Sequence, residues 1–490
     1  MAHWPLLSLL TFLPLLGVGG ILIFSRDERV ARWIALGTSL VVLGLAVGVA
    51  FLFDPANADF QFLERARWIP SLDIVYRKGI DGLALVFVLL SGLLTPLAIL
   101  SGFSIKERVP AFMAALLILE TMVMGVFTSL DLVLFYFFFE GALIPLFLLI
   151  GIWGGAKRVY AAIKFFLMTF AGSVLMLVAV FAMAAYAGTT DMTALMNVGF
   201  PKSMALWLWL AFFASFAIKT PLWPFHTWLP YAHGEAPTAG SVLLAGVLLK
   251  MGAYGFIRIG IQMLPQASAY FAPFVMALGA VAVIYTSLVA LAQTDFKRLI
   301  AYASVAHMGI VTIGLFAGQE VALDGAVFVM LSHGLVSCGL FLSAGVLYDR
   351  MHTRELARFG GVTRAMPRYA TVFMILMLAS IGLPGTGGFV GEFLTLLGVF
   401  QANNLVAALA ALGLVLGAAY MLRLYALVFN GPPRDEAVRG LSDLSAREIA
   451  MFVPLLALIF WMGLYPAPLR SLYGPSVAKI ASVYEKEIRP

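Results

Sequence analysis

The 490-residue sequence has few charged residues and a single cysteine. Charged residues make up 11% of the chain and hydrophobic residues 62%, whereas soluble domains carry about a quarter charged residues. So few polar residues cannot cover a surface that faces water, which excludes a secreted, cytosolic or disordered protein. The lone Cys338 excludes a disulfide framework and a thiolate metal site.

The sequence also lacks the motifs by which proteins hold nucleotides and redox cofactors. It contains no phosphate-binding loop, no dinucleotide fingerprint and no cysteine cluster. We therefore expect neither a bound cofactor nor a metal ion in this chain. We attribute the net charge of +6 to Lys and Arg residues in loops that set the membrane topology. Nucleic-acid binding would instead require a clustered basic face.

The hydrophobic residues form runs that are long enough to cross a lipid bilayer. A hydrocarbon core about 30 Å thick takes roughly 20 apolar residues per helix. We predict an all-α, multi-pass membrane protein with about fourteen transmembrane helices. We expect the first apolar run to be a transmembrane helix and not a signal peptide. No Lys or Arg comes before it, and no obvious cleavage site comes after it. The predicted spans are 5–24, 33–53, 81–103, 110–129, 131–151, 160–187, 205–229, 238–260, 270–292, 297–317, 322–348, 369–400, 403–430 and 449–466.

Lys and Arg are distributed unevenly between the predicted loops. If the arginine-rich loop 26–32 is on the inner side, the inner loops hold the excess of basic residues, including five arginines in 349–368. Cytoplasmic loops of membrane proteins carry this excess. The pattern therefore predicts that both termini lie on the outer side of the membrane.

Two of the predicted helices contain residues that interrupt a helix. Pro221 and Pro224 lie within span 205–229, and the glycine-rich segment 382–389 lies within span 369–400. Proline removes a backbone donor and clashes with the carbonyl one turn earlier. Because lipid cannot satisfy the freed carbonyls, both breaks are expected to face protein or water.

The two breaks occupy matching positions in the chain. Each lies in the fourth helix of a five-helix unit, residues 110–260 and residues 261–430. An odd number of helices inverts the second unit relative to the first, which is the layout of many secondary transporters. Residues 1–109 then form an N-terminal three-helix segment, and residues 431–490 form the last helix and a tail.

Six ionisable residues fall near the middle of predicted spans. A charge there costs at least about 2.5–3.5 kcal/mol, so we expect these groups to be paired, hydrated or neutral. Glu, Lys and His can all exchange protons, and a row of them can pass protons through water. A hydrogen-bonded packing role is the alternative for each histidine, and for His226 and His233 loop structure and a proton entrance are both open. The six candidates are Glu140, Lys219, Lys250, His307, His333 and Glu392, with Glu120 and Lys164 as weaker ones.

Several motifs resemble those of the antiporter-like membrane subunits of respiratory complex I. They include Lys219-Thr-Pro-Leu-Trp-Pro-Phe-His at the first break, Asp295-Phe-Lys-Arg-Leu-Ile-Ala-Tyr, and Gly382-Leu-Pro-Gly-Thr-Gly-Gly-Phe at the second break. The Glu-Ala-Pro-Thr block at 235–238 and the glutamate at 392 are similar to subunits of the M type, the bacterial counterpart of mitochondrial subunit 4.

The resemblance implies a proton-translocating membrane-arm subunit of NADH:quinone oxidoreductase, an enzyme whose redox centres lie in other subunits. It implies that NADH, FMN, iron–sulfur clusters and quinone bind to those partners, and that L- and N-type subunits flank this chain in the lipid bilayer. A subunit of a multisubunit cation/proton antiporter and a subunit of a membrane-bound hydrogenase are the alternatives.

The resemblance also suggests an order for the relay. Glu140 would pair with Lys219 across the first break, and Lys219 would release its proton toward Lys250 when that pair separates. The histidines His307 and His333 would relay the proton laterally, and Glu392 would form the outlet or the link to the next subunit.

Overall fold

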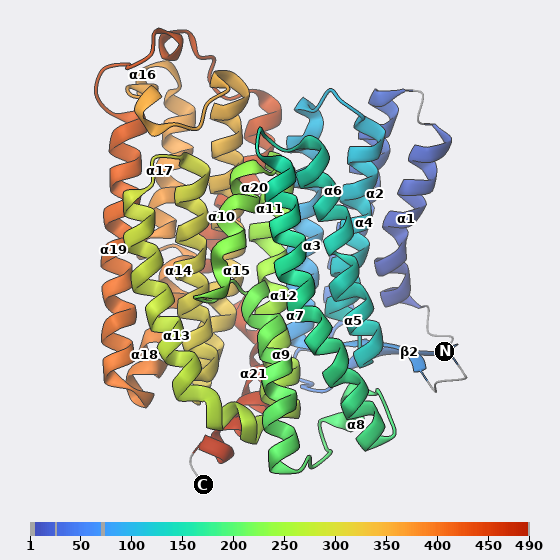
Figure 1. Ribbon diagram of the computed structural model, residues 1–490. Helices are drawn as coiled ribbons and strands as arrows, with labels where there is room; N and C mark the ends of the chain where they lie inside the picture. The colour runs from blue at the N-terminus through green and yellow to red at the C-terminus, as the bar shows by residue number, and fades with distance from the viewer. Residues whose placement is uncertain (1–4, 25–26, 70–73, 489–490) are drawn as a thin grey trace.

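The computed structural model describes residues 5–24, 27–69 and 74–488 and shows a bundle of long helices (Figure 1). Thirteen helical stretches in these residues are long and apolar enough to span a membrane. A further crossing consists of two shorter apolar helices, α17 (Pro367–Ser380) and α18 (Gly387–Ala402), which are joined at a break. The prediction of a helical, multi-pass membrane protein with about fourteen crossings is confirmed.

The helices of the first half alternate with short connections. They are α1 (Leu6–Ile23), α2 (Glu28–Leu52), α3 (Gly82–Ser101), α4 (Val109–Thr128), α5 (Leu132–Gly141), α6 (Leu143–Trp153), α7 (Arg158–Ala187), α8 (Met192–Leu195), α9 (Lys202–Lys219) and α10 (Leu229–Glu235). Two short 3₁₀ segments, η2 (Gly102–Ser104) and η3 (Phe225–Trp228), belong to this half.

The second half contains two π-helical segments, η4 (Leu244–Leu248) and η5 (Phe256–Ile261), and two 3₁₀ segments, η6 (Leu356–Arg358) and η7 (Glu436–Gly440). Its remaining helices are α11 (Thr238–Leu243), α12 (Leu249–Gly255), α13 (Pro265–Ala292), α14 (Phe296–Phe316), α15 (Glu320–Met351), α16 (Val362–Ala365), α19 (Asn404–Phe429), α20 (Ala446–Leu464) and α21 (Ala467–Ile488).

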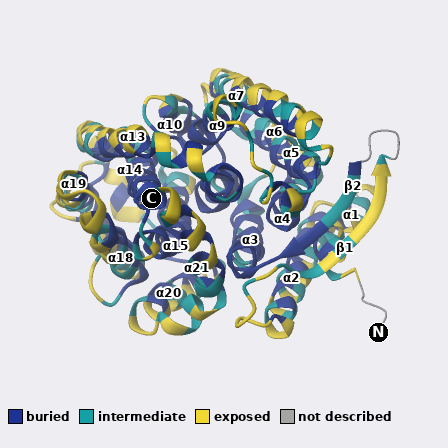
Figure 2. Ribbon diagram, turned by 90° about the horizontal axis from the view of Figure 1, so that it is seen from below, coloured by how far each residue is buried: buried dark blue, intermediate teal, exposed yellow. Residues whose placement is uncertain are grey.

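Two crossings form the centre of the bundle. In α15 and in the crossing from α11 to η5, the apolar 18-residue stretch is entirely buried. In α1, α2 and α20, only a third of the corresponding stretch is buried. Figure 2 shows the same gradient, with buried residues around α3 and α15 and exposed ones on the outward sides of α7 and α19. The exposed apolar side chains of the rim can face lipid, and the ionisable residues of the central crossings are buried inside the bundle.

Two elements at one end of the bundle were not predicted. The strands β1 (Gln61–Ile69) and β2 (Ile74–Ile80) pair antiparallel, so the chain is not purely helical. The tail forms α21, which lies against α3, α13 and α15. Helix α21 is amphipathic, with one buried face, and does not contain a run of about 20 apolar residues. The sequence prediction missed it for that reason. The buried face of α21 consists of Tyr473, Ser476, Val477, Ile480, Ala481 and Tyr484.

Lys78 of β2 is completely buried where the hairpin meets the bundle. Its ammonium group donates hydrogen bonds to Thr11 Oγ1 at 2.5 Å and Thr128 Oγ1 at 2.8 Å, and three aromatic rings lie 5.1–5.7 Å from it. No ion pair to Lys78 occurs in the described part of the chain. Burial therefore lowers the pKa of Lys78 from 10.5 to about 7, against a smaller opposing effect of Glu64.

Replacing Lys78 by methionine is expected to remove a pH dependence of stability. The unfolded chain binds a proton at Lys78 more tightly than the folded chain, so stability is lowest below about pH 7 and rises toward about pH 10.5, by up to ~1.4 kcal/mol per pH unit. Thermal unfolding of the detergent-solubilised protein across this pH range measures the effect. The exposed Lys202, replaced in the same way, serves as the control. An identical pH slope in the Lys78→Met variant and the unmodified protein would refute the prediction.

Candidate functional site

The first predicted break lies directly after Lys219. Helix α9 ends at this residue, and η3 begins at Phe225. The carbonyls near the end of α9 find partners inside the protein: Leu222 N–H donates to Ala217 O at 2.8 Å, and Trp228 Nε1–H donates to Ile218 O at 2.9 Å. The break predicted from Pro221 and Pro224 is confirmed, and its polar backbone atoms face protein.

Lys219 and Glu140 lie near each other without touching. The side chain of Lys219 is 3% exposed, and its Nζ lies 4.8 Å from the centre of the Phe139 ring. Both carboxylate oxygens of Glu140 are buried and lack a hydrogen-bond partner among the described residues, and the charges of Glu140 and Lys219 act on each other. The expected ion pair is therefore open in this structure, since no ion pair joins the two residues among the described parts of the chain.

Glu140 lies next to a third interruption in the helices, between α5 and α6. Helix α5 ends at Gly141, one residue after Glu140, and α6 starts at Leu143. The ring of Pro145 excludes a regular helical bond to the carbonyl of Gly141, four residues earlier. Sequence analysis did not predict this third interruption, although Pro145 is a visible signal for it.

A π-helical turn positions Lys250 in the middle of a buried crossing. The turn η4 directly precedes α12, which carries Lys250 near its start. Lys250 is completely buried, and its Nζ contacts the carbonyl oxygen of Ala245 at 2.5 Å and Nδ1 of His333 at 2.8 Å. The π turn contains Ala245, and its carbonyl oxygen accepts from the ammonium group of Lys250.

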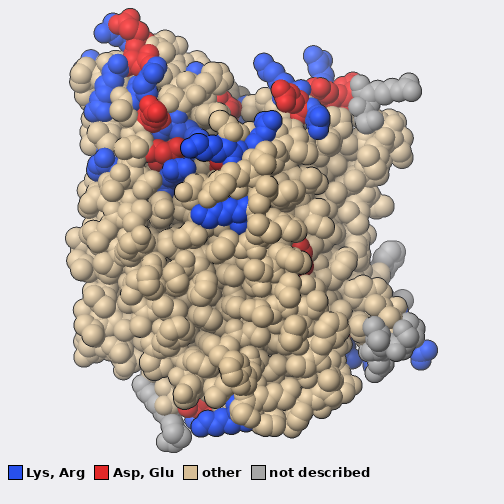
Figure 3. Space-filling model, viewed as in Figure 1, with Lys and Arg blue, Asp and Glu red and all other residues tan. Residues whose placement is uncertain are grey.

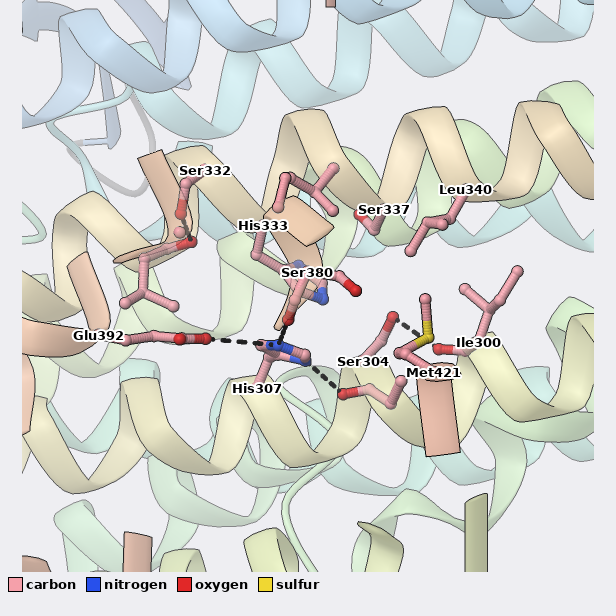
Figure 4. Close-up of a pocket in the computed structure, with 15 residues that line it drawn as sticks. Ile300, Ser304, His307, Ser332, His333, Ser337, Leu340, Ser380, Glu392 and Met421 are labelled. Atoms are coloured by element: carbon pink, nitrogen blue, oxygen red, sulfur yellow. Dashed lines mark hydrogen bonds and ion pairs between the residues drawn. The ribbon is translucent and has the colours of Figure 1, made fainter. Parts of the chain in front are cut away.

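A row of side chains continues from Lys250 toward the second break. The rings of His333 and His307 are 5.4 Å apart, and His307 Nε2 lies 3.4 Å from Oε1 of Glu392. His307 also contacts the carbonyl oxygens of Ser380 at 3.0 Å and Ala303 at 2.7 Å. Figure 4 shows His307 with Glu392 on one side and His333 on another.

These side chains border a small cavity. It has a volume of about 20 Å³, and serines line it together with the two histidines and Glu392. About one water molecule fits into such a volume. A single water there would bridge His333 and His307, between which no direct hydrogen bond is formed in the described chain.

The structure thus joins four of the six predicted residues and leaves two apart. Lys250, His333, His307 and Glu392 form one row, whereas no hydrogen bond joins the cluster of Glu140 and Lys219 to that row among the described residues. No group of three or more His, Cys, Asp or Glu side chains in those residues could hold a metal ion.

Two further ionisable groups are buried inside the bundle. Glu120 of α4 is 1% exposed, and neither of its carboxylate oxygens has a hydrogen-bond partner in the described chain. His233 of α10 is completely buried, and neither ring nitrogen has a partner there. The signal available in the sequence was an ionisable residue inside an apolar run, but that signal does not tell which side of a helix faces the bundle.

Gly382 makes room for Glu392 at the second break. Helix α17 ends at Ser380 and α18 begins at Gly387, so the break predicted from the glycine-rich segment is confirmed. Gly382 has φ +74°, and a Cβ atom at this position would lie 2.6 Å from Oε2 of Glu392. Glycine is required here both for the backbone conformation and for the close approach of the carboxylate.

The substitution Gly382→Ala is expected to displace Glu392 and weaken its contact with His307. Gly385→Ala is a matched control, because Gly385 also has a positive φ but its Cβ would meet only Leu464 at 3.8 Å. We expect both variants to lose roughly 1 kcal/mol or more of stability from backbone strain. Only Gly382→Ala should in addition slow proton transfer through the assembled complex in vesicles, and an equal effect of the two variants would contradict this.

Comparisons with known proteins are consistent with this architecture. Residues 129–417 match the model of the family described as "NADH:quinone oxidoreductase/Mrp antiporter, TM". The chain belongs to this family. Subunit M of the NADH-quinone oxidoreductase of Rhodobacter capsulatus is 52% identical to it, over 99% of this chain and 98% of the relative. The likeness to members of the NADH:quinone oxidoreductase/Mrp antiporter family therefore extends well beyond the matched segment.

Solved structures share the fold over the same length. A chain of respiratory complex I from Thermus thermophilus with bound NADH is 32% identical, with a TM-score of 0.89, and the match covers 98% of this family member and 99% of that chain. A chain of the Mrp complex from a Dietzia species matches with a TM-score of 0.87 over the whole of both chains. Because its identity is only 20%, the Dietzia chain shows a shared fold alone.

Proposed function

We propose that this chain translocates protons as the M-type membrane-arm subunit of an NADH:quinone oxidoreductase, a translocase whose redox chemistry takes place in other subunits. The observation that carries the proposal is the row of Lys250, His333, His307 and Glu392 within a membrane-spanning bundle. The 52% identity to a subunit M supports the enzyme assignment. The likeness to the Mrp complex reaches only the fold, so we do not propose cation/proton antiport.

The proposal extends to partners and membrane orientation. Other subunits of the complex are the partners of this chain, with L- and N-type subunits as its flanking neighbours. NADH, FMN, iron–sulfur clusters and quinone bind to partner subunits. The chain resides in a bacterial cytoplasmic membrane with its termini on the periplasmic side, in accord with the charge excess of the predicted inner loops.

The row moves protons in short steps. Lys250 and His333 exchange a proton across a contact of 2.8 Å, and a water in the central cavity carries it from His333 to His307. His307 passes it to Glu392 across 3.4 Å. Each step needs only a hydrogen bond or one intervening water, which is the range over which side chains exchange protons efficiently.

Opening of the Glu140–Lys219 pair starts proton transfer along the row. A closed ion pair at 4 Å stabilises the charged lysine by about 4 kcal/mol in surroundings of intermediate dielectric. Opening the pair removes this stabilisation, so Lys219 releases its proton toward Lys250. The change exceeds the ~2.3 kcal/mol needed to move one charge across 100 mV. The open pair seen here corresponds to the releasing state. Of the six candidate residues, the five-helix units 110–260 and 261–430 carry three each.

Proton pumping by Glu140→Gln and Lys219→Met variants tests the proposal. Inverted membrane vesicles containing the assembled complex oxidise NADH while a fluorescent dye reports acidification. We expect pumping to fall by about tenfold or more in both variants at an unchanged amount of complex, because the driving pair is lost. The exposed Lys202→Met is the control. Undiminished pumping with normal assembly in both variants would refute the proposed role of the pair.

A further inference from the structure

We propose that Phe139 is a positioning residue whose ring receives the ammonium group of Lys219 when the pair with Glu140 opens, and that this second contact makes the opening faster. The inference rests on the proposed function and adds a residue that the sequence analysis did not single out. Because a phenyl ring has no proton to exchange, Phe139 acts through Lys219 and is not itself a member of the proton-carrying row.

The ammonium group of Lys219 lies over an aromatic ring in this structure. Its Nζ is 4.8 Å from the centre of the Phe139 ring, and a cation is attracted to a ring face within about 6 Å. No hydrogen bond and no ion pair of this ammonium group occurs in the described parts of the chain. The ring of Phe139 therefore takes the place of the Glu140 carboxylate as the partner of Lys219.

Phe139 and Glu140 are successive residues of α5, so one helix offers two partners to the same lysine. Side chains of successive helical residues point about 100° apart around the helix axis. The ring of Phe139 and both carboxylate oxygens of Glu140 are buried. Lys219 moves from one partner to the other by rotating its own side-chain bonds, and opening of the pair needs no large movement of the backbone.

Two further aromatic rings hold Phe139 in place. Phe135, one turn earlier on α5, stacks on Phe139 with a centroid distance of 5.5 Å. Phe216 meets it edge to face at 6.0 Å and belongs to α9, the helix that ends at Lys219. Stacked and edge-to-face contacts stabilise aromatic clusters. The ring of Phe139 therefore keeps its position whether or not the ammonium group lies over it.

The aromatic cluster also reaches the helix that carries Lys250. Phe216 packs so closely against α12 that a Cβ atom at Gly255 would overlap its ring. The rings of Phe139 and Phe216 thus connect α5, α9 and α12. An ammonium group that leaves Glu140 for Phe139 remains among the three helices that carry Glu140, Lys219 and Lys250.

The surroundings strengthen the attraction between the ring and the ammonium group. Phe139 and Lys219 are both buried. Charged side chains on the face shown in Figure 3 gather toward the two ends of the bundle, and most of the band between them is uncharged. A contact between a cation and a ring is stronger when water is excluded, yet it remains weaker than an ion pair. Phe139 therefore holds Lys219 only transiently.

The ring acts on the rate at which the pair opens. An ammonium group that leaves Glu140 without finding another partner would be an uncompensated buried charge, which is costly. Phe139 lowers that cost while the pair separates. After Lys219 has released its proton, the neutral amine is no longer attracted to the ring face. Phe139 therefore accelerates the step that precedes proton release.

Fluorinated phenylalanines at position 139 test the inference in the assembled complex. Each added fluorine weakens the attraction of the ring face for a cation and changes the size of the ring little. We expect the rate of proton pumping in vesicles to fall with one, two and three fluorines, by about tenfold over the series. The same replacements at Phe135 are the matched control and should leave pumping unchanged, because no cation lies over that buried ring in the described chain.

The variant Phe139→Leu complements the fluorinated series. Leucine keeps an apolar side chain but removes the ring, so this variant should pump at least as slowly as the complex with three fluorines. The rate is compared at an equal amount of assembled complex. If Phe139→Leu fails to assemble, the fluorinated series alone decides, since fluorine leaves the packing nearly unchanged.

The outcomes separate this inference from the proposed function. If pumping is the same at every degree of fluorination while Glu140→Gln and Lys219→Met pump slowly, Phe139 has a structural role only and the inference is overturned. A rate that rises with fluorination would show that the ring retains the protonated lysine, and it would overturn the inference as well. If Glu140→Gln and Lys219→Met pump normally, the proposed function itself fails.

Discussion

Replacement of Lys250 by methionine is expected to abolish proton pumping by the complex, the largest functional effect of any single change in this chain. Methionine fills a similar volume but removes the ammonium group that contacts both His333 and the carbonyl of Ala245. The row then loses the group that exchanges protons with His333. Dye-monitored acidification of vesicles during NADH oxidation measures the loss, and the amount of assembled complex on native gels provides the reference.

The variant Lys250→Arg separates charge from proton exchange. Arginine keeps the positive charge in the centre of the bundle, yet it does not give up its proton at any accessible pH. We therefore expect Lys250→Arg to pump no better than Lys250→Met. Tyr254→Phe, one turn farther along the same crossing, removes a buried hydroxyl that lies outside the row and should leave pumping intact. Normal pumping by Lys250→Arg would show that Lys250 acts through its charge alone.

Replacement of Asp81 by leucine is expected to cause the largest loss of stability. Asp81 caps α3 and forms a buried ion pair with Arg258, whose side chain is 1% exposed. Removing the carboxylate leaves a guanidinium group without a counter-charge inside the bundle, which costs roughly 3–5 kcal/mol. The thermal unfolding midpoint in detergent should fall markedly, and less of the chain should accumulate in membranes.

The double variant Asp81→Leu/Arg258→Met provides the matched control. Replacing both members of a buried ion pair by apolar residues is often neutral, because no uncompensated charge remains. We expect the double variant to regain most of the stability lost by Asp81→Leu, apart from about 1 kcal/mol for the lost cap of α3. Equal unfolding midpoints for the single and the double variant would contradict the importance of the pair.

Local chemistry explains which features could be predicted from the sequence. The breaks after Lys219 and before Glu392 follow from proline and glycine, whose effects on a helix do not depend on distant residues. The interruption beside Glu140 has the same cause, and attention to Pro145 would have predicted it. Hydropathy separates apolar transmembrane spans from polar loops. The amphipathic α21 resembles neither, so hydropathy did not predict it.

Contacts between distant segments could not be predicted in the same way. Lys250 and His333 are 83 residues apart, and their contact depends on how α12 packs against α15. The stack of His233 on Phe341 and the unsatisfied nitrogens of His233 likewise exist only once α10 lies beside α15. The resemblance to complex I subunits indicated candidate residues but not their distances.

The sequence by itself determined that this is a helical membrane protein with two broken crossings and ionisable residues inside apolar runs. Apolar length, proline and glycine act through the local backbone, so they specify these features before any helices pack. Tertiary structure alone decided that Lys250, His333, His307 and Glu392 form one row, that the pair of Glu140 and Lys219 is open, and that the buried ring of His233 stacks on Phe341. The reason is that proton transfer requires contacts of about 3 Å, and packing of the helices sets distances on that scale.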